Sequence, residues 1–246
     1  MKIIPVIDLL DGKVVHAVRG RRGQYQPVHS RLCKNTDPDN IVQAFLGLFP
    51  FDTIYIADLN AINHTGNHET TITALIDRNN SVEFWIDRGT SSRHEIDRLH
   101  RPAQRHVIGS ETGIGPESLS LFRQYFPDII LSLDFLHGQL SGDEALLQQP
   151  QSWPDTLVVM DLDRVGSAGG PDVDKLVSVK SRAGSRTLFA AGGIRNSDDL
   201  DTLIEAGIDG VLMASALHTG TINRDDLQQV RAKKMPRRAG HHPSNG

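Results

Sequence analysis

Short runs of β-branched and other apolar residues alternate along this chain with longer segments whose apolar residues recur at helical spacing. This alternation is typical of strand–helix–strand units built on a parallel sheet. Eight strands are predicted: Lys2–Ile7, Thr53–Ala57, Val82–Asp87, His106–Gly109, Asp128–Asp134, Thr156–Asp161, Thr187–Ala191 and Gly210–Ala214. Because 246 residues are close to the ~250 of a one-domain barrel with eight such units, we expect an α/β fold, the (β/α)8 TIM barrel.

Four helices have recognisable starts, with Ser, Asp or Gly in the capping position or Pro in the first turn. They are predicted at Asp39–Leu48, Ser92–Leu99, Gly115–Phe126 and Ser197–Ala206. The stretch Gly138–Trp153 is expected to be mostly loop. From residue 233 onward the sequence KKMPRRAGHHPSNG has no apolar face. We therefore predict one barrel domain over residues 1–232 and a disordered tail over residues 233–246.

The first four predicted strands resemble the last four, which indicates an internal half-barrel repeat. Matching strand ends carry an aspartate or a small residue followed by similar neighbours. The matched pairs are Ile7–Leu9 with Leu133–Phe135, Ala57–Leu59 with Met160–Leu162, Asp87–Thr90 with Ala191–Ile194, and Ile108–Ser110 with Met213–Ser215. Two half-barrels of similar design that close face to face are the simplest explanation.

Composition narrows the classes of protein that this chain can be. With 38% hydrophobic and 23% charged residues and a net charge of −4, it is typical of a globular enzyme rather than of a nucleic-acid or membrane-surface protein. Its one cysteine, Cys33, rules out an internal disulfide and a cysteine metal cluster. The apolar N-terminus contains Pro5 and Asp8, so a buried strand is expected there rather than a signal peptide. We expect a cytoplasmic protein without membrane spans.

Four aspartates lie at strand ends, where the active site of a barrel is built: Asp8, Asp58, Asp134 and Asp161. An aspartate in such a place can also simply cap the following helix or loop. Asp8 and Asp134 occupy matched positions in the two halves, so the repeat predicts that they face each other across the barrel mouth. Two carboxylates can act as acid and base when their surroundings set their pKa values apart.

A glycine turn opens the helix after the seventh strand, and a small-residue turn follows the eighth. Exposed backbone N–H groups in such turns bind phosphate, and strands seven and eight often hold the phosphate in these barrels. The alternative is that the glycines serve only turn geometry. The predicted phosphate-binding residues here are Gly192, Gly193, Ala214 and Ser215.

Three motifs resemble the histidine-biosynthesis barrels, the HisA-type sugar isomerase and its sister HisF-type cyclase. They are IPVIDLLDGKVVHAVRG (Ile4–Gly20), VVMDLDRVGSAGGPD (Val158–Asp172) and FAAGGIRNSDDL (Phe189–Leu200). The isomerase is the closer match, because the cyclase has a lysine after its first-strand aspartate where this chain has Leu10 and Asp11. The resemblance implies an aldose–ketose isomerase with Asp8 as general base and Asp134 as general acid. It also implies that Ser167 takes the place of a threonine that assists catalysis in the family's sixth-strand loop.

The chain departs from that family at the second phosphate site. The family's third-strand Gly-Gly-Gly-Ile-Arg is replaced here by Ile86–Thr90. Its fourth-strand Gly-Thr, which small residues follow in the family, is replaced here by Gly109 and Ser110, and Glu111 comes next. Asp87 and Glu111 would repel a phosphate unless Arg88 compensates. We therefore predict one intact phosphate site and one that is lost or rebuilt. Further substrate-binding candidates are Arg19, Arg88, Gly109 and Ser110.

Other features have a structural alternative that we favour. His64 and His68 have a metal-ligand spacing, but no third ligand is evident, so a polar loop and no metal are expected. The cluster Arg19–Arg22 is either a solvated loop or an anion contact above the mouth. Trp85 is expected in the core, and Trp153 is either packed or stacked on a ligand.

Three functional hypotheses remain from the sequence. The chain is the histidine-pathway isomerase, or a divergent relative that acts on another monophosphorylated compound, for example in tetrahydromethanopterin cofactor synthesis, or a non-catalytic barrel that binds a phosphometabolite. For each of them we expect a small phosphorylated ligand, no cofactor, no nucleic acid or membrane partner, and a monomer or small homo-oligomer.

Overall fold

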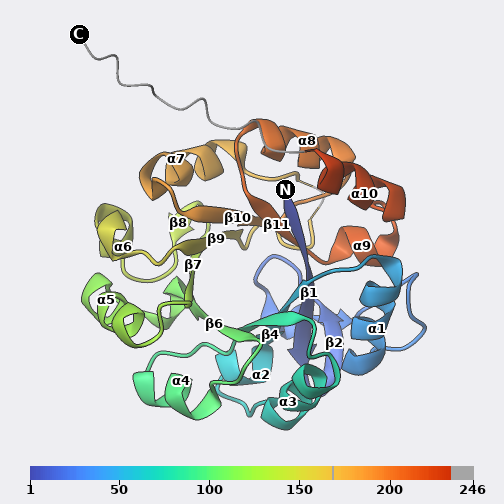
Figure 1. Cartoon of the computed structure of the whole chain (residues 1–246), viewed down its shortest axis with the longest axis horizontal. Coiled ribbons are helices and arrows are strands. Elements are labelled where there is room, and N and C mark those ends of the chain that lie inside the picture. The colour runs from blue at the N-terminus through green and yellow to red at the C-terminus, as the bar shows by residue number, and fades with distance from the viewer. Residues whose placement is uncertain (168, 234–246) are drawn as a thin grey trace.

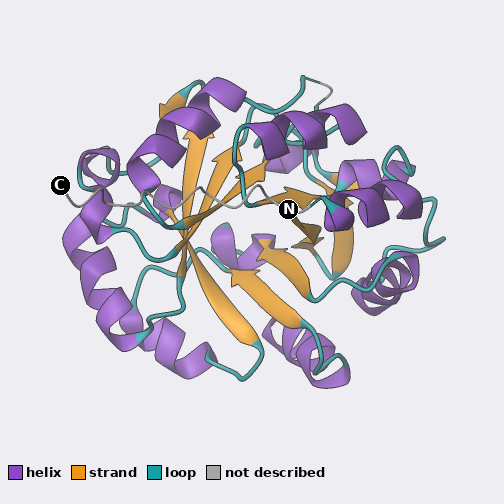
Figure 2. Ribbon diagram, turned by 45° about the horizontal axis from the view of Figure 1, so that its top comes forward, coloured by secondary structure: helices purple, strands orange, loops and turns teal. Residues whose placement is uncertain are grey.

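The computed structural model describes residues 1–167 and 169–233 and forms a closed ring of eight parallel strands surrounded by helices (Figures 1 and 2). The expected (β/α)8 barrel is confirmed. The tail predicted over residues 233–246 lies, apart from Lys233, outside the described residues. The ring strands are β1 (Lys2–Leu10), β4 (Thr53–Asp58), β5 (Glu83–Asp87), β6 (Gln104–Gly109), β7 (Ile130–Leu136), β9 (Thr156–Asp161), β10 (Thr187–Ala191) and β11 (Gly210–Met213).

The ring closes where the last strand pairs in parallel with the first. β11 and β1 run in register from Lys2 opposite Gly210 to Pro5 opposite Met213. Gly210 is required at this seam, because a Cβ there would stand 2.7 Å from the Lys2 carbonyl oxygen and 2.3 Å from the Phe189 ring. Closure leaves none of these eight strands with an unpaired edge.

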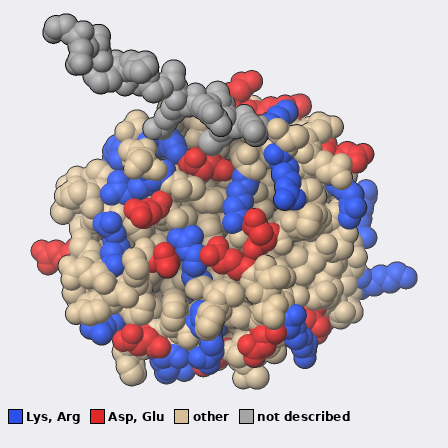
Figure 3. Space-filling model, viewed as in Figure 1, with Lys and Arg blue, Asp and Glu red and all other residues tan. Residues whose placement is uncertain are grey.

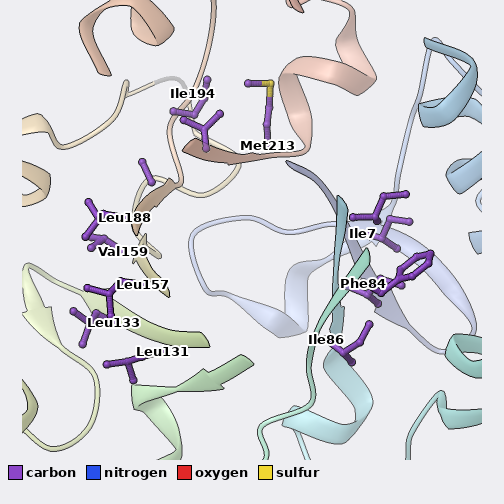
Figure 4. Close-up of a cluster of buried hydrophobic side chains, with 14 of the residues drawn as sticks. Ile7, Phe84, Ile86, Leu131, Leu133, Leu157, Val159, Leu188, Ile194 and Met213 are labelled. Atoms are coloured by element: carbon purple, nitrogen blue, oxygen red, sulfur yellow. The ribbon is translucent and has the colours of Figure 1, made fainter. Parts of the chain in front are cut away.

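Two layers of apolar side chains alternate along the strands, one inside the ring and one between the ring and the helices. In β4, Tyr55 and Ala57 belong to the inner cluster, whereas Ile54 and Ile56 belong to the outer one. Trp85 packs edge-on against Phe189 in the inner cluster, with ring centroids 4.8 Å apart, as expected for a core residue. Figure 4 shows members of the outer cluster on both sides of the ring. Burial on both faces explains why these strands read as continuous apolar runs.

The longer helices lie outside the ring and are α1 (Pro38–Leu48), α3 (Glu69–Arg78), α4 (Arg93–Leu99), α5 (Pro116–Tyr125), α7 (Val173–Ala183), α8 (Ser197–Glu205) and α10 (Arg224–Ala232). The four predicted helices appear at their predicted places. Asp37 caps α1 through the Asn40 N–H, and Ser92 and Glu95 form a capping box on α4.

Short elements occupy several connections between strands and helices. They are α2 (Leu59–Ile62), η2 (Ser110–Thr112), β8 (Gln139–Leu140), α6 (Ala145–Gln148), η3 (Pro150–Ser152) and α9 (Ser215–Thr219). β8, α6 and η3 fill the stretch that was expected to be mostly loop. Trp153 follows them, fully buried, and its Nε1 donates to the Leu146 carbonyl oxygen at 2.8 Å. It therefore packs in the core and does not stack on a ligand.

A hairpin that was not predicted extends the first strand over the mouth, although its Asp11-Gly12 turn is a typical hairpin signal. β1 continues to Leu10, turns at Asp11 and Gly12 with positive φ angles, and pairs antiparallel with β2 (Lys13–His16). The turn η1 (Arg22–Gln24) follows, and β2 then pairs with β3 (Gln26–Pro27). This excursion brings three polar side chains to the open end of the barrel, those of His16, Arg22 and Tyr25.

The surface seen in Figure 3 carries Lys and Arg side chains interspersed with Asp and Glu. Among the described residues, no helix combines the length and the apolar character that a membrane crossing requires.

Candidate active site

One cavity of about 250 Å³ opens at the carboxyl ends of the ring strands. Residues at the ends of β1, β4, β5, β7, β9, β10 and β11, and Glu111 just after β6, contribute to its lining. This is the end of the barrel at which parallel strands present their following loops, where such folds build active sites.

Asp8 and Asp134 both line this cavity, as the repeat predicts. Asp8 lies on β1 and Asp134 on β7, and three strands separate β1 from β7 in either direction around the ring. The two carboxyls therefore come from opposite walls. A ligand in the cavity has one on each side.

Asp134 is 4% exposed and is held by a small network of neighbours. Ser132 Oγ donates to its Oδ1 at 2.5 Å, and its own backbone N–H donates to Ser110 Oγ at 2.9 Å. Burial, together with the charges of Asp87 and Glu111, raises the pKa of Asp134 to about 8, although the hydrogen bond from Ser132 opposes the rise. At neutral pH this carboxyl therefore keeps its proton and can act as an acid.

Asp8 is half-buried and has a different electrostatic setting. Burial raises its pKa to about 7, the charge of Asp87 adds to the rise, and the guanidinium of Arg22 opposes it. Asp8 thus ionises before Asp134, which is the order that a base and an acid require. Tyr25 lies close by, and burial together with the charge of Asp8 raises the pKa of its phenol to about 12, so it stays neutral. Because these groups interact, the carboxyls titrate as a coupled set.

Asp87 supplies a third carboxyl to the cavity, at the end of β5. It is 7% exposed, and it accepts hydrogen bonds from Tyr55 Oη at 3.0 Å and from the Gly89 N–H at 3.0 Å. Burial, together with the charge of Glu111, raises the pKa of Asp87 to about 6, against the opposing hydrogen bond from the Gly89 N–H. Burial and the Asp87 charge also hold the pKa of Tyr55 well above its usual value, so Tyr55 remains a hydrogen-bond donor.

The structure places Arg88 away from this cavity. Alternation along the strand sends Asp87 inward and Arg88 outward, where it is 8% exposed and lies in the field of Asp58 and Glu69. Arg88 is therefore not placed to compensate the charge of Asp87, as the sequence had suggested. Arg22 is the basic residue at the mouth instead, and its Nη2 contacts Glu111 Oε1 at 2.5 Å.

The remaining loop candidates, Arg19, Gly109 and Ser110, are not part of the cavity lining. Arg19 is exposed with a φ of 48°, and its backbone N–H, rather than its side chain, bonds to the Val165 carbonyl oxygen. Gly109 and Ser110 support Asp134 rather than lining the cavity. A Cβ on Gly109 would stand 3.0 Å from Asp134 Oδ2 and 3.9 Å from Asp87 Oδ2, so the glycine leaves room for both carboxyls.

The predicted phosphate-binding residues Gly192, Gly193, Ala214 and Ser215 all line the wall formed by β10 and β11. The two glycines have φ angles of 100° and 83°. A Cβ would meet the Asp161 carbonyl oxygen at 2.5 Å in the first case and the Gly170 carbonyl oxygen at 2.3 Å in the second. Only glycine fits this turn, and its backbone is open to the cavity.

His16 lies at the same wall and was missed by the sequence analysis. Its Nε2 is 3.0 Å from Ser215 Oγ, although the two residues are 199 positions apart in the chain. Burial lowers the pKa of His16, which favours its neutral imidazole. Ser167 also lines the cavity, with its hydroxyl donating to the Arg164 carbonyl oxygen at 2.9 Å.

Asp58 and Asp161 have structural partners, which favours the capping alternative. Asp58 accepts from the Ala61 and His68 N–H groups, and Asp161 bonds to Lys175 Nζ at 2.7 Å. His68 accepts from the Gly12 N–H at its Nε2, so its Nδ1 carries the proton that is shared with Asp58 at 2.8 Å. Within residues 1–167 and 169–233, no group of three His, Cys, Asp or Glu residues is arranged to hold a metal ion.

The sequence is similar along most of its length to other proteins. The family described as "Histidine biosynthesis protein" matches residues 2–223. An uncharacterized protein of Methanocaldococcus jannaschii is 32% identical over 233 residues, covering 92% of this chain and 97% of that protein. The 1-(5-phosphoribosyl)-5-((5-phosphoribosylamino)methylideneamino) imidazole-4-carboxamide isomerases of Nitrosopumilus maritimus and Sulfurovum sp. are 27% and 24% identical, covering 94% and 92% of this chain and 99% and 97% of their own.

Proposed function

The chain belongs to the histidine biosynthesis protein family, and we propose that it is an acid–base isomerase that converts a phosphorylated aminoaldose into the corresponding aminoketose. The family resemblance predicted from the three motifs is confirmed by the match over residues 2–223. Relatives at 24–27% identity are named as isomerases of an imidazole carboxamide that carries two phosphoribosyl groups. Their names support the reaction type more strongly than they support the substrate.

In the proposed first step, Asp134 donates its proton to the ring oxygen of the aminoaldose. The ring C1–O bond breaks, and the nitrogen lone pair forms a C1=N iminium. A protonated carboxyl is needed for this step, and burial of Asp134 together with two neighbouring acids supplies one at neutral pH.

In the proposed second step, ionised Asp8 removes the proton from C2. The C2–H electrons form a C1=C2 bond and the C1=N electrons return to nitrogen, which gives an enolamine. Asp8 then returns this proton at C1, and the proton of the C2 hydroxyl passes to Asp134 as the ketone forms, which restores both carboxyls to their starting forms. The substrate's own nitrogen accepts the electron pair, so the proposal requires no metal or organic cofactor.

The other cavity residues would bind and orient the substrate. The N–H groups around Gly192 and Gly193 and the hydroxyl of Ser215 would hold the single phosphate. His16 would gain a proton when a phosphate dianion arrives beside it, because a nearby negative charge favours the charged imidazolium. Ser167 would turn from the Arg164 carbonyl toward a sugar hydroxyl.

One observation carries this proposal: two carboxyls from opposite walls face the same cavity, and burial and the charge of Asp87 raise the pKa of both, with Arg22 opposing the rise at Asp8. A binding protein for a phosphometabolite has no need for two buried acids beside its ligand, since burying an acid without a counter-charge costs stability.

The test uses the aminoaldose phosphate that forms when ribose 5-phosphate is mixed with aniline. Conversion to the aminoketose is followed by NMR, with aniline and sugar phosphate alone as the background rate. We expect Asp8→Asn and Asp134→Asn each to lower turnover by about 100-fold or more, the range of a single proton transfer. Asp77→Asn on the exposed face of α3 makes the same chemical change away from the cavity and should leave turnover intact. Near-normal turnover by Asp8→Asn would reject the proposal.

A second experiment distinguishes the histidine-pathway isomerase from a divergent relative. Asp87 and Glu111 stand at the wall opposite Gly192 and Gly193, where a second phosphate of a doubly phosphorylated substrate would have to lie. We therefore expect the gene not to restore growth of a histidine auxotroph that lacks the isomerase, while a known family isomerase expressed in parallel restores it. Growth equal to that of the known isomerase would assign the chain to the histidine pathway.

A further inference from the structure

The two ends of the cavity have opposite chemistry. The wall at β10 and β11 presents backbone amides and the hydroxyl of Ser215. Asp87 on β5 faces that wall from across the ring, and Asp8 and Asp134 stand on the walls to either side. A molecule that binds its phosphate at the first wall must therefore place its other end among acids.

Asp87 is the residue that makes the end of the cavity opposite β10 and β11 acidic. Its position is fixed on both oxygens, since Tyr55 Oη bonds to Oδ2 and the Gly89 N–H bonds to Oδ1, each at 3.0 Å. A carboxylate oxygen accepts two hydrogen bonds, so each oxygen can take one more from a ligand. Asp87 Oδ2 and Asp134 Oδ2 lie near each other, because both border the space that the missing side chain of Gly109 leaves open.

Among the described residues, one basic side chain of the cavity lining partly compensates these acids. Arg22 is the only Lys or Arg among the cavity-lining residues within the described chain, and it already pairs with Glu111 at 2.5 Å. Burial raises the pKa of all three aspartates, and the charge of Arg22 offsets only part of the rise at Asp8 and Asp87. Because Glu111 already pairs with Arg22, a bound cation would stabilise the ionised forms of these aspartates further.

Two candidate occupants fit poorly. A second phosphate would add negative charge beside Asp87 and Glu111, which is unfavourable at short range in a site with little water. A metal ion needs several ligands around one point, and the described residues contain no group of three His, Cys, Asp or Glu side chains that could hold one. An organic cation with N–H donors suits both the charge and the open acceptor positions.

We propose that Asp87 makes this end of the cavity selective for a protonated amine, so that the natural substrate carries one phosphate and, at its far end, a basic nitrogen. The inference rests on the proposed function, which supplies the phosphate site at the opposite wall. The hydrogen bonds that Asp87 accepts from Tyr55 Oη and the Gly89 N–H favour its ionised form, so Asp87 is the aspartate that pairs with the amine. Asp134 can then keep the proton that catalysis needs.

Three synthetic probes with the same carbon chain test this selectivity by calorimetry at neutral pH. Aminohexyl phosphate has an ammonium at its far end, hydroxyhexyl phosphate has a neutral hydroxyl, and hexanediol bisphosphate has a second phosphate. Inorganic phosphate is titrated first to verify the phosphate site. We expect the amine to bind about tenfold or more tightly than the alcohol, because buried charge pairs have large coupling energies, and the bisphosphate to bind most weakly.

Asp87→Asn keeps the shape of the side chain and removes its charge, so it should abolish the advantage of the amine over the alcohol. Asp77→Asn is the matched control and should keep that advantage in full. Thermal melting of each variant verifies the fold, and if Asp87→Asn does not fold, the ranking of the three probes on the unaltered protein decides alone.

Equal affinity for the amine and the alcohol, or tightest binding of the bisphosphate, overturns the inference. If inorganic phosphate still binds in that case, the proposed phosphate site stands and only the amine selectivity is wrong. If inorganic phosphate and all three probes fail to bind, the proposed function is wrong and the inference falls with it.

Discussion

Replacement of the buried acid Asp134 by asparagine should stabilise the protein at alkaline pH. Burial raises the pKa of Asp134 from 3.8 to about 8, so the folded protein keeps a proton that the unfolded chain has already lost. Stability from this group is fully present below the unfolded pKa and is lost as the pH rises toward the folded value. Asparagine carries no proton to lose, so Asp134→Asn avoids this loss.

The size of the effect follows from the pKa shift. One pKa unit corresponds to about 1.4 kcal/mol, so a rise of roughly four units sets an upper limit of about 6 kcal/mol for the whole transition. Neighbouring acids that titrate together and water that enters the cavity reduce this limit. Between about pH 5.5 and about pH 8.5, we expect the variant to gain about 1–3 kcal/mol relative to the parent protein.

Urea unfolding at the two pH values measures this difference directly. The midpoint should shift in favour of Asp134→Asn at the higher pH while the slope of the transition stays the same, since the area exposed on unfolding does not change. The exposed control Asp77→Asn should show no such dependence. A difference between variant and parent that is the same at both pH values would refute the argument that burial destabilises this carboxylate.

The remaining predictions concern the two walls of the cavity. The pH profile of kcat/KM should be a narrow bell with limbs near 7 and 8, because Asp8 must be ionised and Asp134 protonated; undiminished activity at about pH 5 would contradict it. Gly109→Ala puts a methyl group 3.0 Å from Asp134 Oδ2, so kcat should fall about tenfold while affinity for inorganic phosphate is unchanged in calorimetry. His16→Ala should weaken binding of inorganic phosphate several-fold, most strongly below about pH 6.5, and unchanged affinity there would show that His16 does not contact the anion.

Periodicity predicted the barrel because its signals are local. β9 (Thr156–Asp161) and β10 (Thr187–Ala191) have the predicted bounds, since each is a buried apolar run between polar turns. β1 extends past its predicted end because the hairpin with β2 pairs its last residues, and short half-exposed strands leave little pattern. The pairing of β1 with β2, rather than the apolar run, decides where β1 ends.

The catalytic candidates were accessible from sequence only where the repeat marked them. Asp8 and Asp134 occupy matched positions, and both line the cavity. Contacts between distant segments left no such signal in the sequence. Arg22 and Glu111, for example, are 89 positions apart and form an ion pair because the conformations of two loops bring them together, and the sequence does not predict those conformations. The opposite orientations of Asp87 and Arg88 follow from strand alternation, and because the predicted strand already ended at Asp87, the sequence was sufficient to place Arg88 outside the ring.

Hydrogen exchange from the ketose side tests the acid–base pair most directly. The aminoketose phosphate is incubated with the enzyme in D2O, and NMR follows deuterium incorporation at C1. Removal of a C1 proton requires the base, whereas the acid acts on the ring oxygen and the C2 oxygen. We predict that Asp134→Asn still exchanges this hydrogen, more slowly than the parent protein, and that Asp8→Asn does not. Exchange by Asp8→Asn at the rate of the parent protein would contradict the assignment of Asp8 as the base.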